Sequence, residues 1–147
     1  MIQVWLPLKK DSATTTKRSQ FFRTQVRIRS GRVIVVEHDV RESAFIGRML
    51  SELGMHVQIA NDVKDAVELL LKLGEAPAML VCDVVMPGGS GFDVVERARE
   101  LFPELPILFV SGYVGRRETS RIPYSACLEK PFKLQELEEA ISALLGS

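Results

Sequence analysis

The sequence has little cysteine and no long apolar run. Its 147 residues include two cysteines, Cys82 and Cys127, and both lie within apolar stretches. Cysteines in such surroundings are typical of small core residues and form no disulfide scaffold, which favours a reducing compartment. No apolar run approaches the ~20 residues that a helix needs to cross a bilayer, and the first residues do not have the pattern of a signal peptide. We therefore expect a cytoplasmic protein with no membrane span in this chain.

The chain also lacks net charge, although its charges are unevenly distributed. Lysines and arginines number 19, and so do the acids, so no overall field favours nucleic acid as a partner. The first 32 residues contain eight lysines and arginines and one acid, and all the other acids follow. Two interpretations of this basic segment stay open, a solvated linker and an arm that contacts nucleic acid or anionic lipid. We favour the linker and expect no direct contact with nucleic acid.

The hydrophobic pattern divides the chain near residue 31. The stretch Ile2–Pro7 alternates like a short strand that a proline ends. Such a strand needs a partner strand, which this chain need not contain. Residues 9–31 show no clear hydrophobic period, which is typical of a linker. We therefore predict a strand remnant and basic linker over residues 1–31, and a single domain over residues 32–147.

From residue 33 on, apolar runs alternate with amphipathic stretches. The runs predict strands at Val33–Val36, Met55–Ala60, Ala78–Cys82, Pro106–Val110 and Ala126–Glu129. The amphipathic stretches predict helices at Glu42–Leu53, Asp62–Leu73, Phe92–Phe102 and Lys133–Leu145. A fifth, short helix lies between Gly115 and Arg121, where it is the fourth in chain order and has room for only a turn or two. This alternation predicts an α/β fold: a doubly wound parallel sheet of five strands in the flavodoxin-like order 2-1-3-4-5, with helices on both faces and a shortened fourth helix.

Polar side chains follow four of the predicted strands. Glu37 and His38 follow the first strand, Asp83 the third, Ser111 the fourth and Lys130 the fifth. Because the carboxyl ends of parallel strands meet at one edge of the sheet, we expect these side chains to lie close together. In the predicted strand order, the crevice between the first and third strands holds Glu37, His38 and Asp83.

This set of residues suits phosphoryl transfer. Clustered carboxylates raise each other's pKa unless a cation neutralises them, and carboxylate oxygens suit Mg²⁺ or Mn²⁺. Asp83 would then be a nucleophile, next to the Ser111 hydroxyl and the Lys130 ammonium, in front of a loop rich in Pro and Gly at Met86–Gly91. By itself, Asp83 also fits a turn former at the end of a strand, and it is the combination of residues that favours a phosphoryl acceptor.

The motifs VIVVEHD, CDVVMPGGSG, FVSGY and LEKPF resemble, in this order, those of the receiver domain of two-component response regulators. The resemblance extends from about Arg32 to Leu145. It implies that Asp83 is the phosphorylated aspartate, that Ser111 is the switch hydroxyl, and that Lys130 contacts the phosphate.

The resemblance also implies a set of metal and phosphate neighbours. Glu37, Asp83 and the backbone oxygen of Val85 would bind Mg²⁺ or Mn²⁺, and Gly112 would lie beside the phosphate. His38 stands where the family has a second acid. Histidine is a poor ligand for Mg²⁺ and a better one for softer ions, which leaves open weak Mg²⁺ binding, a preference for Mn²⁺, or a partly degenerate site. The strand pattern does not favour a one-residue shift that would put Asp39 in the place of His38.

Two further departures from the family lie after the predicted fourth strand. Cys127 occupies the position of the family's switch aromatic residue, which predicts that the coupling of a rotating ring to Ser111 is absent or altered. The stretch between Ser111 and Cys127 is also shorter than the family's usual length. We expect this shortening to change the face that many receivers use to dimerise. A weak homodimer stays open among the partners.

We predict that the chain accepts a phosphoryl group on Asp83 from a histidine kinase or a histidine phosphotransfer protein, and that it is not a stand-alone enzyme. The stretch Ile2–Pro7 resembles the last strand of a histidine kinase ATP-binding domain, and no output domain follows Leu145. Both features favour the carboxy-terminal receiver of a hybrid histidine kinase. The alternative is a pseudo-receiver that binds partners without phosphorylation, and His38 is the reason to keep it.

Overall fold

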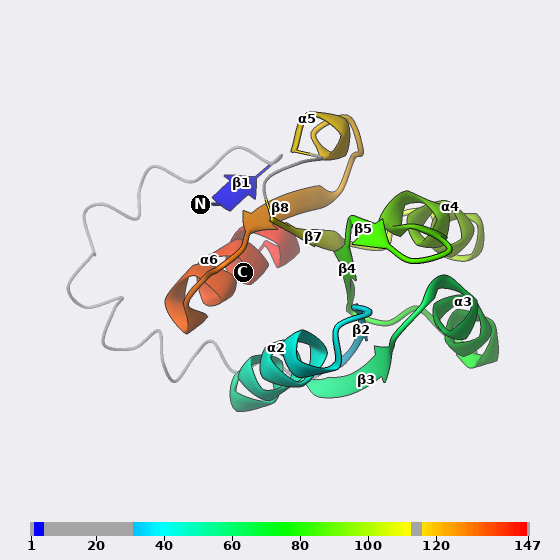
Figure 1. The fold of residues 1–147 in the computed structure, drawn as a ribbon, viewed down its shortest axis with the longest axis horizontal. Coiled ribbons are helices and arrows are strands. Elements are labelled where there is room, and N and C mark those ends of the chain that lie inside the picture. Colours follow the sequence, from blue (N-terminus) through cyan, green and yellow to red (C-terminus); the bar gives the residue numbers. More distant parts are fainter. Residues whose placement is uncertain (1, 5–30, 113–115, 147) are drawn as a thin grey trace.

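The computed structural model describes residues 2–4, 31–112 and 116–146 (Figure 1). Six strands form one sheet: β1 Ile2–Val4, β2 Arg32–Val36, β3 His56–Ala60, β4 Met79–Asp83, β7 Ile107–Ser111 and β8 Ser125–Glu129. The helices are α2 Val40–Glu52, α3 Val63–Lys72, α4 Gly91–Leu101, α5 Arg116–Thr119 and α6 Leu134–Leu145. No helix among these described residues is long and apolar enough to cross a membrane.

The five predicted strands form a parallel sheet in the predicted order. The sheet runs β3-β2-β4-β7-β8, and each neighbouring pair is parallel, which confirms the flavodoxin-like order 2-1-3-4-5. In this arrangement β2 is a central strand, hydrogen-bonded to β3 on one side and to β4 on the other. The carboxyl ends of β2, β4, β7 and β8 therefore meet at one edge of the sheet.

The sixth strand, β1, extends the sheet at its β8 edge. It runs antiparallel to β8, with Ile2 opposite Leu128 and Val4 opposite Ala126. The sequence left open a partner outside this chain, but in the structure the partner is β8. The linker predicted between the two strands lies outside the described residues, and the domain boundary near residue 31 stays a prediction.

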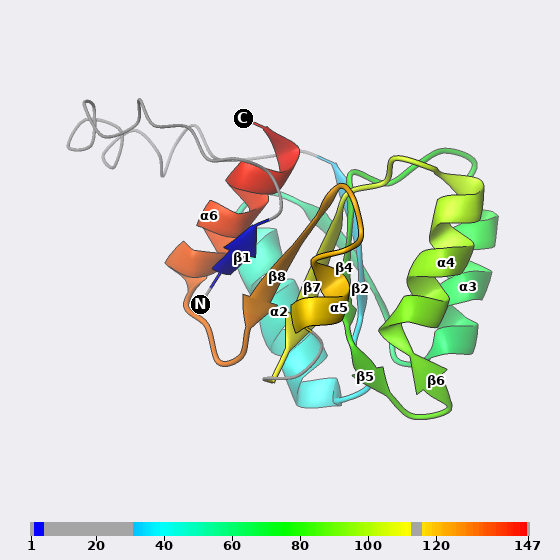
Figure 2. The ribbon, with the colours of Figure 1, turned by 90° about the horizontal axis from the view of Figure 1, so that it is seen from above.

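Helices cover both faces of the sheet, as predicted. Figures 1 and 2 show α2 and α6 on one face, and α3 and α4 on the other. Because successive side chains of a strand point to opposite faces, β2 contributes to two cores. Val33 and Val35 pack into the core under α2 and α6, whereas Ile34 and Val36 pack into the core under α3 and α4. All four are fully buried, which explains their unbroken apolar character.

Three local details differ from the sequence prediction or refine it. The helix α2 begins at Val40, two residues before the predicted start, because Asp39 caps it by accepting from the backbone N–H groups of Arg41 and Glu42. The loop predicted after Asp83 contains a small antiparallel hairpin, β5 Val85–Met86 and β6 Gly89–Ser90. In the described part of the connection from β7 to β8, the helix α5 has four residues, which confirms the shortened fourth helix.

Candidate functional site

Four strand ends bring the predicted site residues to one edge of the sheet. Glu37 follows β2, Asp83 ends β4, Ser111 ends β7 and Lys130 follows β8. The pairing of β7 with β8 continues one residue beyond β8, because the backbone N–H of Lys130 donates to the carbonyl of Ser111 at 2.7 Å. Residues as distant in sequence as Glu37 and Lys130 therefore become direct neighbours.

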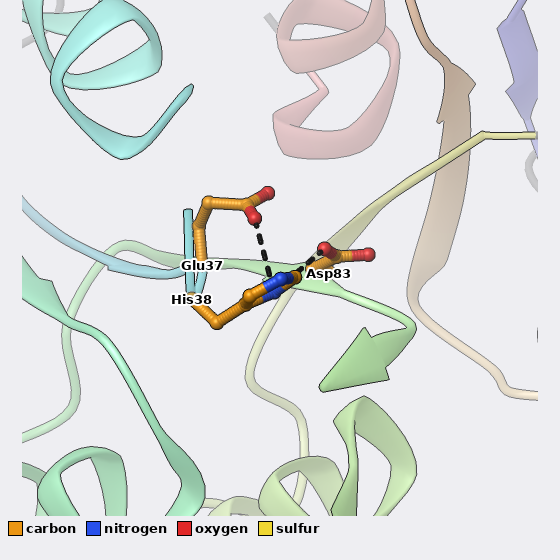
Figure 3. A group of neighbouring side chains, drawn as sticks. All are labelled: Glu37, His38 and Asp83. Atoms are coloured by element: carbon orange, nitrogen blue, oxygen red, sulfur yellow. Dashed lines mark ion pairs between the residues drawn. The ribbon is translucent and has the colours of Figure 1, made fainter. Parts of the chain in front are cut away.

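Glu37, His38 and Asp83 form a compact cluster. One ligand atom from each residue can be chosen so that all three atoms lie within 4.8 Å of one another. Figure 3 shows the His38 imidazole between the two carboxylates, with Nδ1 3.5 Å from Oε2 of Glu37 and 3.9 Å from Oδ2 of Asp83. The carboxylates are buried, with side chains 1% and 7% exposed, whereas the imidazole is 44% exposed. The cluster is therefore open to solvent on the histidine side.

The Lys130 ammonium neutralises part of this negative charge. Its Nζ lies 2.9 Å from Oε1 of Glu37 and 3.3 Å from Oδ2 of Asp83. It also donates to Oε1 of Glu42 at 2.6 Å. Burial of Lys130 by itself lowers the pKa of the ammonium, but the hydrogen bonds with Glu42 and Glu37 and the charge of Asp83 raise that pKa well above its ordinary value. Lys130 is therefore a permanent cation at physiological pH.

The Glu37 carboxylate is in an unfavourable place for a charge. Burial raises the pKa of Glu37, and the nearby charge of Asp83 raises it further. Hydrogen bonds from Lys130 and from the backbone N–H of Asp39 act in the opposite direction but do not cancel the effect of burial. A second cation at this site would relieve the remaining cost.

The donor set fits a divalent cation. Two buried carboxylates supply the oxygen ligands that Mg²⁺ and Mn²⁺ both accept. His38 adds an imidazole nitrogen, which Mn²⁺ and other transition ions bind more readily than Mg²⁺ does. Val85, the source of the expected backbone ligand, lies two residues beyond Asp83, and its N–H donates to Oδ1 of Asp83 at 3.2 Å. That bond fixes the orientation of the carboxylate relative to the β5–β6 hairpin.

The remaining predicted residues lie at the end of β7. Ser111 is buried, with 3% of its surface exposed, and Gly112 is exposed. A β-carbon on Gly112 would meet no described atom within 4 Å, so packing in this state does not require a glycine there. The structure thus places Ser111 at the predicted edge, whereas the need for a small residue at position 112 stays a prediction about the phosphorylated state.

Gly91 has a structural role that the sequence prediction missed. A β-carbon at this position would collide with the backbone carbonyl of Asp83, and the N–H of Gly91 donates to the carbonyl of Val84 at 2.9 Å. Helix α4 therefore begins directly against the residue predicted to accept the phosphoryl group. The Pro- and Gly-rich composition of the loop was visible in the sequence, but this close approach was not.

Glu42 is the second residue of this site that the sequence prediction missed. It appeared only as the first residue of a predicted helix. The earlier start of α2, at Val40, puts Glu42 within the first turn, and its carboxylate lies against Lys130. The helix dipole favours an acid in the first turn of any helix. The position of Glu42 in the sequence therefore gave no reason to connect it with Lys130.

Comparison with known proteins agrees with this geometry. The family model of the response regulator receiver domain matches residues 33–142. The response regulator receiver protein CpdR of Brucella abortus is 33% identical over 118 residues, which cover 78% of this chain and 96% of CpdR. The autoinducer 1 sensor kinase/phosphatase LuxN of Vibrio campbellii is 34% identical over 124 residues, which cover 83% of this chain but 14% of LuxN.

Among solved structures, the receiver domain of the sensor histidine kinase PA1611 from Pseudomonas aeruginosa superimposes with a TM-score of 0.70. It is 24% identical, and the alignment covers 81% of this chain and 100% of that domain, which holds a magnesium ion in its active-site cleft. At this identity the superposition supports the fold alone. The match to the family model and the identity to CpdR go further, and together they show that the chain belongs to the receiver domain family of two-component response regulators.

Proposed function

We propose that this receiver domain accepts a phosphoryl group from phosphohistidine on the carboxylate of Asp83. A carboxylate oxygen attacks the phosphorus atom, the bond from phosphorus to the donor imidazole nitrogen breaks, and the leaving imidazole takes a proton from solvent. The observation that carries the proposal is the Lys130 ammonium, 3.3 Å from Oδ2 of Asp83, where it can neutralise the charge of the transferred group.

The reaction needs a second cation, and we propose that Glu37, Asp83, His38 and the backbone oxygen of Val85 hold it. When bound, a divalent ion would neutralise phosphoryl oxygens that one lysine cannot. The imidazole nitrogen supports a preference for Mn²⁺ over Mg²⁺, because it stands where an oxygen ligand would suit Mg²⁺ better.

We also propose that the donor and the recipient of the phosphoryl group are a histidine kinase or a histidine phosphotransfer protein. Two kinds of relative support this, a response regulator receiver protein and a sensor kinase. The match covers 96% of CpdR but 14% of LuxN, a sensor kinase/phosphatase. A place within a hybrid histidine kinase is consistent with the second relative and belongs to the proposal.

His38 supports a second candidate function, a pseudo-receiver that binds partners without phosphorylation. The imidazole occupies the space between the two carboxylates, where the expected cation would lie (Figure 3). If the metal cannot displace it, the two carboxylates and Lys130 remain a closed set of ion pairs.

The intact mass of the protein after incubation with phosphoramidate separates the two candidates. We expect one added phosphoryl group, formed faster with Mn²⁺ than with Mg²⁺. The variant Asp83→Asn should take up none, because an amide is not a nucleophile for this reaction. His38→Asp restores an oxygen ligand and should strengthen Mg²⁺ binding about tenfold, measured by calorimetric titration.

The outcomes are distinct. An adduct on the natural chain that is absent from Asp83→Asn establishes phosphoryl acceptance. Equal Mg²⁺ and Mn²⁺ affinities in the natural chain would contradict the proposed role of His38. No adduct from phosphoramidate or from a phosphorylated histidine kinase, with either metal, would favour the pseudo-receiver.

A further inference from the structure

The Lys130 ammonium has three N–H donors, and three carboxylates surround it. Oε1 of Glu42 lies at 2.6 Å, Oε1 of Glu37 at 2.9 Å and Oδ2 of Asp83 at 3.3 Å. An ammonium group that binds a phosphoryl oxygen must direct one of its donors to that oxygen. Phosphorylation turns the Asp83 carboxylate into an acyl phosphate, so the donor now directed at Oδ2 of Asp83 can pass to a phosphoryl oxygen. Any further contact of Lys130 with the phosphoryl group must replace its contact with Glu37 or with Glu42.

The three carboxylates differ in how easily they can be released. The side chains of Glu37 and Asp83 are 1% and 7% exposed, whereas that of Glu42 is 46% exposed. A buried carboxylate that loses its partner stays desolvated, which is costly, but a half-exposed one regains water. Glu42 is consequently the partner that Lys130 loses at the lowest cost.

The position of Glu42 is fixed by the site itself. Oδ1 of Asp39 accepts from the N–H of Glu42 at 3.0 Å, and the N–H of Asp39 donates to Oε2 of Glu37 at 3.1 Å. The cap of α2 thus connects the backbone that carries Glu42 to the buried acid of the cluster. These hydrogen bonds place the backbone of Glu42 at a point from which its side chain reaches Lys130.

Glu42 also restores a charge that His38 removes. His38 contributes no carboxylate at the position where the family has its second acid, so Glu37 and Asp83 are the acids of the strand-end cluster. Glu42, in the first turn of α2, brings the acids within reach of Lys130 to three. Glu42 thus contacts Lys130 without belonging to the cluster of Glu37, His38 and Asp83 that could hold a metal ion.

We propose that Glu42 is a positioning residue that holds Lys130 in the unphosphorylated site and yields its place to the phosphoryl group. The inference rests on the proposed function of Asp83 and adds a regulatory element to it. While Glu42 is bound, it neutralises the cation that the transferred group requires and repels anionic donors. It therefore slows phosphorylation, while Glu37 and Asp83 suffice to keep Lys130 in place.

The first test examines the unphosphorylated protein and does not depend on activity. In ¹⁵N–¹H spectra of the lysine ammonium groups, the Lys130 signal should be visible at neutral pH because three carboxylates protect its protons from exchange. Lys130→Met assigns the signal. Glu42→Gln should accelerate its exchange several-fold, and Glu52→Gln, an exposed position in the last turn of the same helix, should leave it unchanged. A signal that does not respond to Glu42→Gln overturns the inference.

The second test measures the initial rate of phosphorylation by phosphoramidate with Mn²⁺. Glu42→Gln should react about three to five times faster than the natural chain, the size expected for a half-exposed ion pair, and Glu52→Gln at the natural rate. An equal or slower rate in Glu42→Gln overturns the inference. A natural chain that takes no phosphoryl group from any donor overturns the proposed function instead, and the ammonium signal then still decides whether Glu42 holds Lys130.

Discussion

Two regions of this receiver domain differ in the interactions that hold them together. The strand-end cluster, formed by Glu37, Asp83 and Lys130, holds two buried carboxylates against one ammonium, with His38 beside them. The return segment, residues 116–125, contains the four-residue helix α5 and leads into β8. Charged groups hold the first region and hydrogen bonds to backbone carbonyls hold the second, so we expect the two regions to respond to different substitutions.

The return segment is held by packing and hydrogen bonds in place of a long helix. Arg99, from α4, donates to the carbonyls of Leu105, Pro123 and Tyr124 at distances from 2.7 to 3.3 Å. Its guanidinium also lies over the Tyr124 ring, 5.7 Å from the centroid. Tyr124 has a left-handed backbone with φ of 56°, which a non-glycine residue adopts only when its surroundings hold it there.

Cys127 lies in β8, two residues beyond the return segment, at the position where the resemblance to the family implies a switch aromatic residue. Cys127 is 4% exposed and belongs to the core under α3 and α4, against which Ile122 of the return segment packs. A small buried thiol cannot swing between an inward and an outward position as a ring does. Position 127 therefore offers no ring that could swing, whereas the contact of Glu42 with Lys130 lies beside the predicted acceptor.

The largest expected effect is on the strand-end cluster alone. Lys130→Met should slow phosphorylation of Asp83 about 100-fold, because the transferred group loses a preorganised cation. The same change should raise the pKa of Glu37, since Lys130 opposes the effects of burial and of Asp83 on that carboxyl. Mass spectrometry measures the rate, and ¹³C NMR of the carboxyl group measures the pKa.

Lys133→Met is the matched control, because Lys133 is exposed three residues further along the same connection. We expect it to react at the natural rate. A Lys130→Met variant that also reacted at the natural rate would show that the ion pairs around Lys130 are structural only. The strand-end cluster would then not differ from the return segment in its effect on phosphorylation.

An intermediate effect is expected in the return segment. Arg99→Met removes the hydrogen bonds to three backbone carbonyls and should lower the free energy of unfolding by about 2 kcal/mol, measured by urea denaturation. The phosphorylation rate should stay within about twofold of the natural one, because no contact of Arg99 reaches the cluster.

Arg97→Met provides the comparison on the same helix. Arg97 is half-exposed and pairs only loosely with Glu100, at 3.4 Å, so its removal should cost less than about 0.5 kcal/mol. Equal losses of stability in Arg97→Met and Arg99→Met would contradict the role given to Arg99.

The smallest expected effect concerns the two thiols, Cys82 next to Asp83 in β4 and Cys127 in β8, two residues beyond the return segment. Burial raises the pKa of the Cys82 thiol well above its usual range, and the charges of Asp83 and Glu37 raise it further. Both cysteines are buried, so iodoacetamide should modify neither in the native protein near neutral pH. In Arg99→Met, Cys127 should react several-fold faster than Cys82, because loosening of the return segment uncovers the core at Ile122 before β4 is disturbed.

Peptide mapping after a timed reaction measures the two thiols separately. Simultaneous modification of Cys82 and Cys127 in Arg99→Met would indicate that the protein opens as one unit. In that case the return segment would not open independently of the rest of the domain. The two regions would then differ in their interactions but not in their stability.

Much of the fold could be predicted because its strongest signals are local. The four residues from Val33 to Val36 are all apolar and all buried, as a central parallel strand requires. The start of α2 was predicted two residues late, because the capping role of Asp39 depends on its side chain reaching the N–H groups of Arg41 and Glu42. The structure shows it as the cap of α2, and the cap moves the helix start to Val40.

The candidate site was predicted in its members but not in all its contacts. Strand ends identified Glu37, Asp83, Ser111 and Lys130, since parallel strands deliver their ends to one edge. The third carboxylate on Lys130 was missed, because Glu42 and Lys130 are 88 positions apart and lie on elements of different type. The partner of β1 was missed for the same reason.

By itself, the sequence determined the parallel sheet, its strand order and the edge at which the polar residues collect, because burial and periodicity are written in each segment separately. Only the tertiary structure decided which donors of Lys130 are occupied, which carboxylates are desolvated and how the short return segment is held. These features depend on distances between segments that no single stretch of sequence encodes. The physical reason is that ion pairs and burial are properties of the packed neighbours, and the neighbours are defined only once the chain has folded.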